Sequence, residues 1–191
     1  MLKKRILLKI GSNTLTKDTD HISRGKIEDI GRQIAALKEE YEFIIVSSGA
    51  IAAARQFVKL EHNGEEINIK QALASIGQPH LMRIFQENFR ELGLFTSQCL
   101  LSYSDFEKEQ SRVNIKNTIN VLVANNFIPI INENDTVATD EIKFGDNDKL
   151  AGLTAALLSA DILIIATNTD GIYTKASLLS SAPKTIEEVT D

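Results

Sequence analysis

The chain alternates short apolar runs with longer stretches of helical periodicity, and this alternation limits the folds open to it. Between the runs, apolar residues recur at spacings of three and four, as at Ile27, Ile30 and Ile34, which indicates helices with one buried face. Parallel strands need crossover connections, which such helices provide, so we expect an α/β fold with a largely parallel sheet and helices on both faces. The apolar runs predicted as strands are 5–10, 43–46, 95–101, 127–131 and 161–166.

Several local features refine this prediction. Ser23 is placed to cap the helix that follows it. The pattern over 71–92 predicts two helices interrupted at Gly77-Gln78-Pro79, because proline lacks the N–H that a helix interior uses. Pro129 fits its predicted strand poorly unless it lies at an edge or a bulge. Residues 136–144 predict a small hairpin.

Composition narrows the class of protein. With 191 residues the chain has the size of one domain, and its 43% hydrophobic and 25% charged residues are ordinary for a globular protein. A net charge of -5 argues against a nucleic-acid binder, and the apolar runs are too short for a membrane span or a secretory signal. The one cysteine, Cys99, favours a cytoplasmic protein; we interpret it as a small apolar strand residue rather than a nucleophile.

Two polar clusters stand at the ends of the stretch from Ile131 to Leu150. NENDT (132–136) directly follows an apolar run, and GDND (145–148) opens the next helical pattern. Polar residues at a strand end and a helix start are placed to bind a small polar molecule. Helix capping is the alternative for Asp146 and partly for Asp148, but it does not account for the first cluster.

Glycine turns follow the first two predicted strands, at Lys9-Ile10-Gly11-Ser12 and at Ser47-Ser48-Gly49. Glycine lets backbone N–H groups approach an anion, and the lysine adds positive charge. Either turn alone could simply end a strand, but the carboxyl ends of parallel strands share one edge, so together they favour an anion or phosphate site. Neither a P-loop nor G-x-G-x-x-G occurs, and the three histidines lack metal-ligand spacing.

Four segments carry a resemblance to a known family: KIGS (9–12), VSSGAIA (46–52), INEND (131–135) and GDND (145–148). In order and spacing, over nearly the whole chain, they resemble the motifs of the amino acid kinase family. Their residues are most similar to those of the members that act on glutamate. The resemblance implies a three-layer αβα sandwich that transfers a phosphoryl group from ATP, with Mg²⁺, to the side-chain carboxylate of L-glutamate. The product would be L-glutamyl 5-phosphate, in the first step of proline biosynthesis. Proline as feedback inhibitor, a homo-oligomer of two or four subunits and a cytoplasmic location are implied in the same way.

The resemblance also implies roles for particular residues. Lys9 would contact the transferring phosphoryl group, and Asp148 would orient lysine in the active site. The glutamate-binding positions would be Ser48, Asp135 and Asn147, and the nucleotide-binding positions Lys9, Gly11, Thr167 and Asn168. The chemistry fits these residue types: the substrate carboxylate is already ionised and needs no general base, so positioning and charge stabilisation should suffice.

The chain departs from the family pattern in places. Thr167-Asn168 stands where Thr-Asp is usual, and Tyr173-Thr174 continues as Lys-Ala rather than Asp-Pro. The family's later glycine-rich segment with threonine and lysine, and its RNA-binding-like C-terminal domain, have no counterpart in residues 1–191. We therefore expect a kinase domain that lacks its C-terminal part. Two alternatives stay open: a relative acting on acetylglutamate, aspartate or uridylate, and a non-catalytic sensor of amino acids or nucleotides on the same fold.

Overall fold

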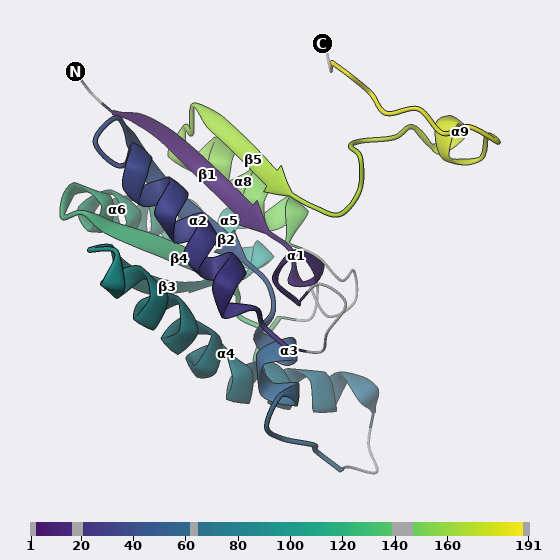
Figure 1. Cartoon of the computed structure of the whole chain (residues 1–191), viewed down its shortest axis with the longest axis horizontal. Helices are drawn as coiled ribbons and strands as arrows, with labels where there is room; N and C mark the ends of the chain where they lie inside the picture. The colour runs from purple at the N-terminus through teal and green to yellow at the C-terminus, as the bar shows by residue number, and fades with distance from the viewer. Residues whose placement is uncertain (1–2, 17–20, 62–64, 139–146, 189–191) are drawn as a thin grey trace.

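The computed structural model describes residues 3–16, 21–61, 65–138 and 147–188. Its described strands form a five-stranded sheet in the order β3-β4-β2-β1-β5, and every neighbouring pair is parallel, as the alternation predicts (Figure 1). The strands are β1 Lys4–Ile10, β2 Tyr41–Ser47, β3 Phe95–Leu101, β4 Phe127–Glu133 and β5 Ile162–Ala166.

Helices cover both faces of this sheet, which confirms the αβα sandwich. The longer described helices are α2 Arg24–Leu37 and α4 Glu66–Glu91 on one face, with α6 Glu109–Ala124 and α8 Asp148–Leu158 on the other. Shorter helices are α1 Ser12–Thr16, α3 Ala50–Arg55, α5 Tyr103–Glu107 and α9 Lys175–Leu178. As predicted, Ser23 caps α2, its Oγ accepting from the Lys26 N–H at 3.4 Å. Among the described helices, none combines the length and apolar character needed to cross a bilayer.

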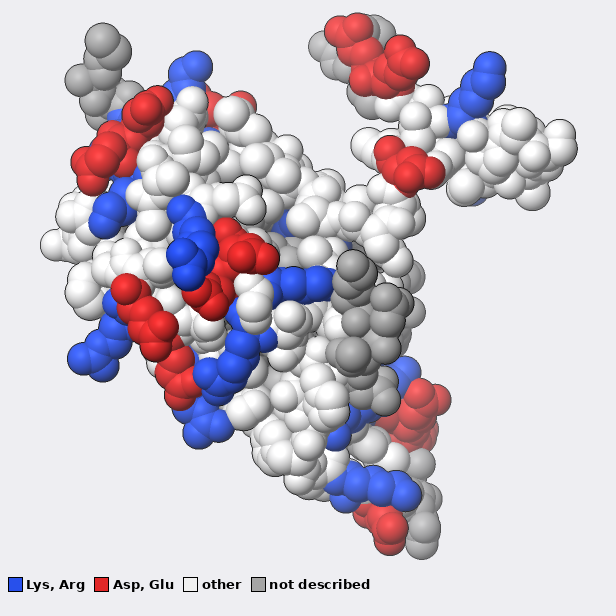
Figure 2. Space-filling view, in the orientation of Figure 1, with Lys and Arg blue, Asp and Glu red and all other residues white. Residues whose placement is uncertain are grey.

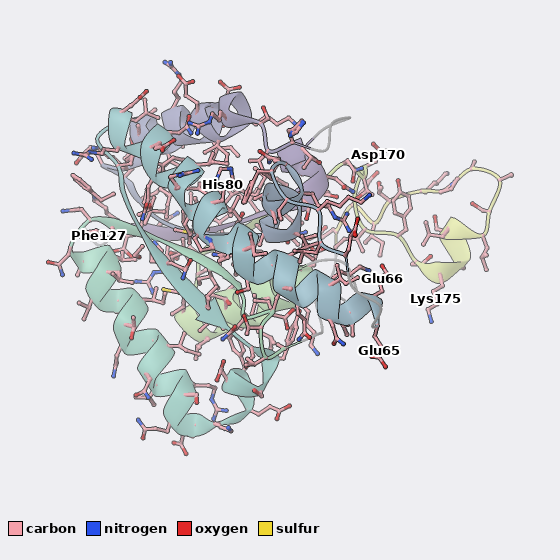
Figure 3. The ribbon with its side chains drawn as sticks, turned by 90° about the horizontal axis from the view of Figure 1, so that it is seen from below. Glu65, Glu66, His80, Phe127, Asp170 and Lys175 are labelled. Carbon is pink, nitrogen blue, oxygen red and sulfur yellow. The ribbon has the colours of Figure 1, made fainter. Side chains whose placement is uncertain are left out.

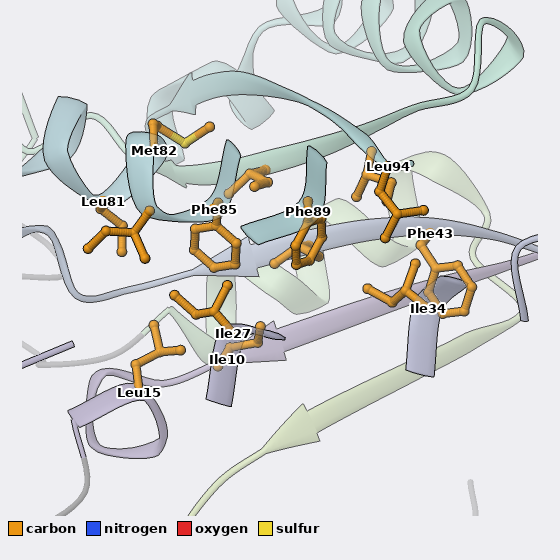
Figure 4. Packing of buried hydrophobic residues seen from close by; sticks show 14 of the residues in the cluster. Ile10, Leu15, Ile27, Ile34, Phe43, Leu81, Met82, Phe85, Phe89 and Leu94 are labelled. Carbon is orange, nitrogen blue, oxygen red and sulfur yellow. The ribbon is translucent and has the colours of Figure 1, made fainter. Parts of the chain in front are cut away.

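Alternation along the strands divides the core between the two faces. In β1, Ile6 and Ile10 pack with α2 and α4, whereas Leu7 packs with α6 and α8. The first cluster centres on Phe85 and Phe89, whose rings meet edge to face with centroids 5.7 Å apart (Figure 4). Each fully buried side chain of this size contributes about 1.5–3 kcal/mol, so the core holds both helix layers on the sheet.

The prediction of two helices between Gln71 and Leu92 was wrong. A single helix, α4, runs through Gly77 and Pro79 without a break. Proline inside a helix costs about 3 kcal/mol. Here α4 buries Leu73 and Ala74 before the proline, and Leu81, Ile84, Phe85 and Phe89 after it, and this packing offsets the lost backbone bond.

Pro129 lies in an interior strand, contrary to the expectation of an edge or a bulge. Strand β4 pairs with β3 along its whole length, but its pairing with β2 begins only at Ile130. The missing N–H of Pro129 therefore falls where no bond to β2 is made. Strand β4 also continues through Asn132 and Glu133, so the first polar cluster begins inside the sheet rather than after it.

The expected hairpin over 136–144 lies mostly outside the described residues. Its described beginning belongs to a turn over 135–137, in which Val137 and Ala138 donate to the Asn134 carbonyl at 3.0 and 2.9 Å. Asp146, the expected helix cap, also lies outside the described residues. Helix α8 has Asn147 at its N-cap position, and the Asn147 side chain makes no capping bond, because it is used elsewhere.

Surface charge on the face formed by α2 and α4 is mixed. Lysine and arginine side chains alternate with acidic ones there, without a basic stripe (Figure 2). The segment after β5, which contains α9, extends away from the sheet (Figure 1). The polar residues that the sequence singled out gather instead at the carboxyl edge of the sheet.

Candidate active site

The two glycine turns meet at one edge of the sheet, as predicted. Ile10 and Ser47 are register partners at the ends of β1 and β2, and the Ser48 N–H donates to the Ile10 carbonyl at 3.1 Å. Figure 3 shows how far this edge is from the other: Phe127, where β4 starts, lies at one end of the molecule, and Asp170, after β5, lies toward the other. Ligands of open α/β sheets bind at the carboxyl edge.

Lys9 places a positive charge at this edge. The residue is only 4% exposed, and its Nζ lies 2.5 Å from Asp148 Oδ1 in the first turn of α8. A buried ammonium needs such a partner, and the ion pair fixes where the charge sits. At Gly11 no side chain stands between the backbone and the ammonium, since a Cβ there would lie 3.4 Å from Lys9 Nζ. An anion can therefore come close to the ammonium.

Asn147 joins three segments of the chain and is fully buried. Its Nδ2 donates to the Ser47 carbonyl and Ser48 Oγ, both at 3.1 Å, and to Asn132 Oδ1 at 2.8 Å. Two predicted glutamate-binding residues, Ser48 and Asn147, are thus in direct contact. Asn147 Oδ1 is buried and accepts no hydrogen bond within the described residues. Such acceptors are rare in native proteins and are suited to a ligand's donor.

Asp135 lines a small cavity of about 140 Å³ beside this cluster. The cavity is formed mainly by α4 and the ends of β3 and β4. Asp135 is 7% exposed, and its Oδ1 has no hydrogen-bond partner among the described residues. Burial, and secondarily the charge of Glu133, raise the pKa of the Asp135 carboxyl to about 7. Gln71 on α4 holds the turn by donating to the Asp135 backbone carbonyl at 3.1 Å. The cavity is well below the size of pockets for drug-sized ligands, so it suits a small polar group.

A larger cavity of about 590 Å³ opens at the opposite edge of the sheet. Its lining includes Tyr41, Phe95 and Phe127, which begin β2, β3 and β4. It lies at the amino ends of the strands and lacks the buried polar cluster, so its greater volume does not make it the better candidate.

The predicted nucleotide residues Thr167 and Asn168 follow β5 and are exposed. Ile10 and Ala166 are register partners, and Thr14 Oγ1 donates to the Ala166 carbonyl at 3.1 Å. Thr167 and Gly11 therefore leave the sheet side by side. Thr167 Oγ1 lies 3.1 Å from Thr169 Oγ1. No hydrogen bond among the described residues links Thr167 or Asn168 to Lys9 or Asn147.

Comparison with known proteins decides the family. The sequence profile of the Amino acid kinase family matches residues 4–191, nearly the whole chain. The chain belongs to the amino acid kinase family.

Its relatives include several kinases. The chain is 44% identical to the glutamate 5-kinase of Alkaliphilus metalliredigens (strain QYMF), over 90% of this chain and 66% of that protein. It is 43% identical to glutamate 5-kinase 2 of Bacillus subtilis (strain 168), over 98% of this chain and 51% of that protein. It is equally similar to the glutamate 5-kinase of Thermoanaerobacter sp. (strain X514), with 98% and 50% covered. The chain thus spans between half and two thirds of the length of these relatives.

Other polar residues of this amino acid kinase are in the site: Asn132, which belongs to the predicted 132–136 cluster but was given no role of its own, and two glutamines that were not predicted. Asn132, Gln78 and Gln98 extend the hydrogen bonds of Asn147. Asn132 gave a signal, since an amide at the end of a strongly apolar run needs a partner. Gln78 and Gln98 gave none, because neither position in its helix or strand distinguishes a buried network from a solvated side chain. The described residues contain no group of three or more acidic, histidine or cysteine side chains suited to a metal.

Proposed function

We propose that this amino acid kinase takes part in ATP-dependent phosphorylation of the side-chain carboxylate of L-glutamate, giving L-glutamyl 5-phosphate for proline synthesis. The observation that carries the proposal is the buried Lys9, paired with the half-exposed Asp148, together with two buried acceptors that have no hydrogen-bond partner among the described residues, Asp135 Oδ1 and Asn147 Oδ1. Relatives called glutamate 5-kinase support it.

The acceptors suit the ammonium end of an amino acid. An α-ammonium offers three N–H donors and a positive charge, which Asp135 and Asn147 Oδ1 can receive. An acetylated amine has no charge and keeps only one N–H donor, so this pairing favours glutamate over acetylglutamate. We assign Ser48 to the same subsite, because its Oγ touches Asn147 Nδ2 at 3.1 Å.

Lys9 and Gly11 suit the phosphate side. A substrate carboxylate is ionised near neutral pH, and the main obstacle is its repulsion from the triphosphate. A fixed ammonium next to the backbone of Gly11 reduces that repulsion without having to reorganise. Asp148 would hold the lysine in place, and Thr167 with Asn168 would contact the nucleotide. Mg²⁺, carried mainly on the phosphates, would neutralise further charge there.

The exposed strand β5 supports the expectation that more of a kinase domain packs beyond it. Ile162, Leu163, Ile164 and Ile165 are 37–45% exposed although they alternate between both faces of the sheet. We propose that further strands and helices of the domain cover them. Inhibition by proline, assembly of identical subunits and a cytoplasmic location are also proposals, and they rest on the family resemblance and on the single cysteine.

The Lys9→Ala variant tests the function. Trapping the acyl phosphate with hydroxylamine, in the presence of ATP, Mg²⁺ and L-glutamate, should show turnover lowered about 10²–10³-fold or more. Lys4→Ala, an exposed change in the same strand, is the control and should keep its rate. Normal turnover in Lys9→Ala would contradict the assignment. Glutamate binding without acyl phosphate in the unchanged protein would instead favour the sensor.

A further inference from the structure

We propose that Gln78 and Gln98 are positioning residues that, together with two backbone groups, hold Asn147 in the orientation that presents its Oδ1 to the substrate. They belong to a chain of four side-chain amides, the amide relay, formed by Gln98, Gln78, Asn132 and Asn147. The inference deepens the proposed function, since it concerns the same glutamate subsite.

The amide relay connects four separate segments. Asn147, before α8, donates through Nδ2 to Asn132 Oδ1 on β4 at 2.8 Å. Asn132 Nδ2 donates to Gln78 Oε1 on α4 at 2.9 Å, and Gln78 Nε2 donates to Gln98 Oε1 on β3 at 3.1 Å. Every bond runs in the same direction, from the substrate subsite towards the edge strand.

Two backbone groups fix this direction. The N–H of Glu133 donates to Asn132 Oδ1 at 2.9 Å, and a backbone N–H cannot accept. The Ser47 carbonyl accepts from Asn147 Nδ2 at 3.1 Å, and a carbonyl cannot donate. An amide side chain keeps nearly the same shape when it is rotated by half a turn, so shape alone would not choose between its two orientations. The Glu133 N–H and the Ser47 carbonyl each allow only one of the two orientations, and in that orientation Asn147 Oδ1 points away from the relay.

The relay ends at Gln98, whose Oε1 accepts the last hydrogen bond, from Gln78. Gln78 is 7% exposed, so water has little access to replace the acceptor that Asn132 Nδ2 needs. Gln98 is exposed, and together with Gln78 it lines the 140 Å³ cavity that also contains Asp135. A side chain at position 98 that can only donate would face the donor Gln78 Nε2. It would therefore favour a half-turn of the Gln78 amide, which places Oε1 there instead. A reversed Gln78 would in turn set two donors against each other at Asn132.

Substitutions at position 98 test this polarity with few folding risks, because the residue is exposed. Gln98→Lys offers only donors, Gln98→Met offers no strong partner, and Gln98→Glu restores the acceptor. Calorimetry with L-glutamate should give about tenfold weaker binding for Gln98→Lys, a smaller loss for Gln98→Met and recovery in Gln98→Glu. Gln86→Lys, on the exposed side of α4, adds the same charge elsewhere and should bind as the unchanged chain does.

A second measurement separates the relay from the proposed function. The side-chain amide signals of Asn147, assigned by their loss in Asn147→Asp, should shift in ¹⁵N-correlated NMR spectra of Gln98→Lys but not of Gln98→Glu. If the unchanged chain binds no glutamate, the proposed function fails and these signals still decide the relay. Equal glutamate affinities for Gln98→Lys and Gln98→Glu, or unmoved Asn147 signals in Gln98→Lys, would overturn it.

Discussion

The fold shifts the pKa of the Asp135 carboxyl group to near neutral pH. Its pKa is raised to about 7, mainly by burial and then by Glu133. Because the folded-state pKa lies above the unfolded value, folding is favoured while Asp135 is protonated, and this stabilisation is lost as the pH rises through 7. We expect the ligand-free chain to lose up to about 3 kcal/mol between pH 5 and 8 relative to Asp135→Asn, as measured by urea unfolding. Parallel profiles for the two proteins would contradict the raised pKa.

Glutamate binding should depend on pH in the opposite sense. In the proposed function the α-ammonium of the substrate would pair best with ionised Asp135, so affinity should rise with pH by up to about tenfold per unit below 7 and level off above it. Calorimetry in two buffers of different ionisation heat should detect proton release at pH 6. Asp135→Asn should bind weakly and without this dependence; a variant that kept the full pH profile would assign it to another group.

Helices α3 and α4 cross in close contact next to the site. A Cβ at Gly77 would lie 1.8 Å from the Ala50 carbonyl oxygen, so only glycine fits. Ala50 begins the helix that directly follows the Ser48-Gly49 turn, and Gly49 has a positive φ of 107°. By packing against Ala50, Gly77 on α4 therefore helps to set the position of the Ser48-Gly49 turn, although the two are far apart in the sequence.

Gly77→Ala should destabilise the chain by at least about 3 kcal/mol, because the backbone of α3 has to move to admit the methyl group. Gly152→Ala in α8 is the matched control: nothing lies within 4 Å of its added Cβ, and helix propensity predicts a gain of about 0.5–1 kcal/mol. Denaturant unfolding of both variants gives the comparison. A loss of less than about 1 kcal/mol in Gly77→Ala would mean that the two helices separate easily.

At the level of elements, local periodicity predicted most of the fold. The strands, the parallel sheet and the meeting of both glycine turns follow from patterns that parallel sheets impose on any sequence. The predicted helix break at Pro79 was wrong because the packing of α4 outweighed the local cost of a proline inside a helix. The expectation that Pro129 lies at an edge or a bulge was wrong because its interior strand pairs only partly with β2. In the site, Lys9, Ser48, Asn147 and Asp148 were expected from the family resemblance. Gln78 and Gln98 were not, since their partners depend on tertiary contacts.

At the scale of the whole sheet, strand β5 is an edge strand, and no other described strand pairs with its outer side. Its side chains are exposed on both faces, and an open edge of this kind favours pairing with another chain. We expect residues 1–191 on their own to associate with increasing concentration in sedimentation experiments. Ile164→Lys should reduce that association, whereas Val121→Lys, an exposed apolar position on α6, should not. Equal association of both variants would locate the contact elsewhere.

The four residues of the amide relay come from β3, α4, β4 and the position before α8. This arrangement has a consequence for recombination between relatives. A chimera that imports one of these segments brings in one member of the chain of donors and acceptors and leaves the other three behind. Where the second parent has other residues at these four positions, crossovers within residues 78–147 therefore risk mismatched partners at the proposed glutamate subsite even when both parents fold alike. An exchange with such a relative should succeed most often when that whole interval is inherited from one parent.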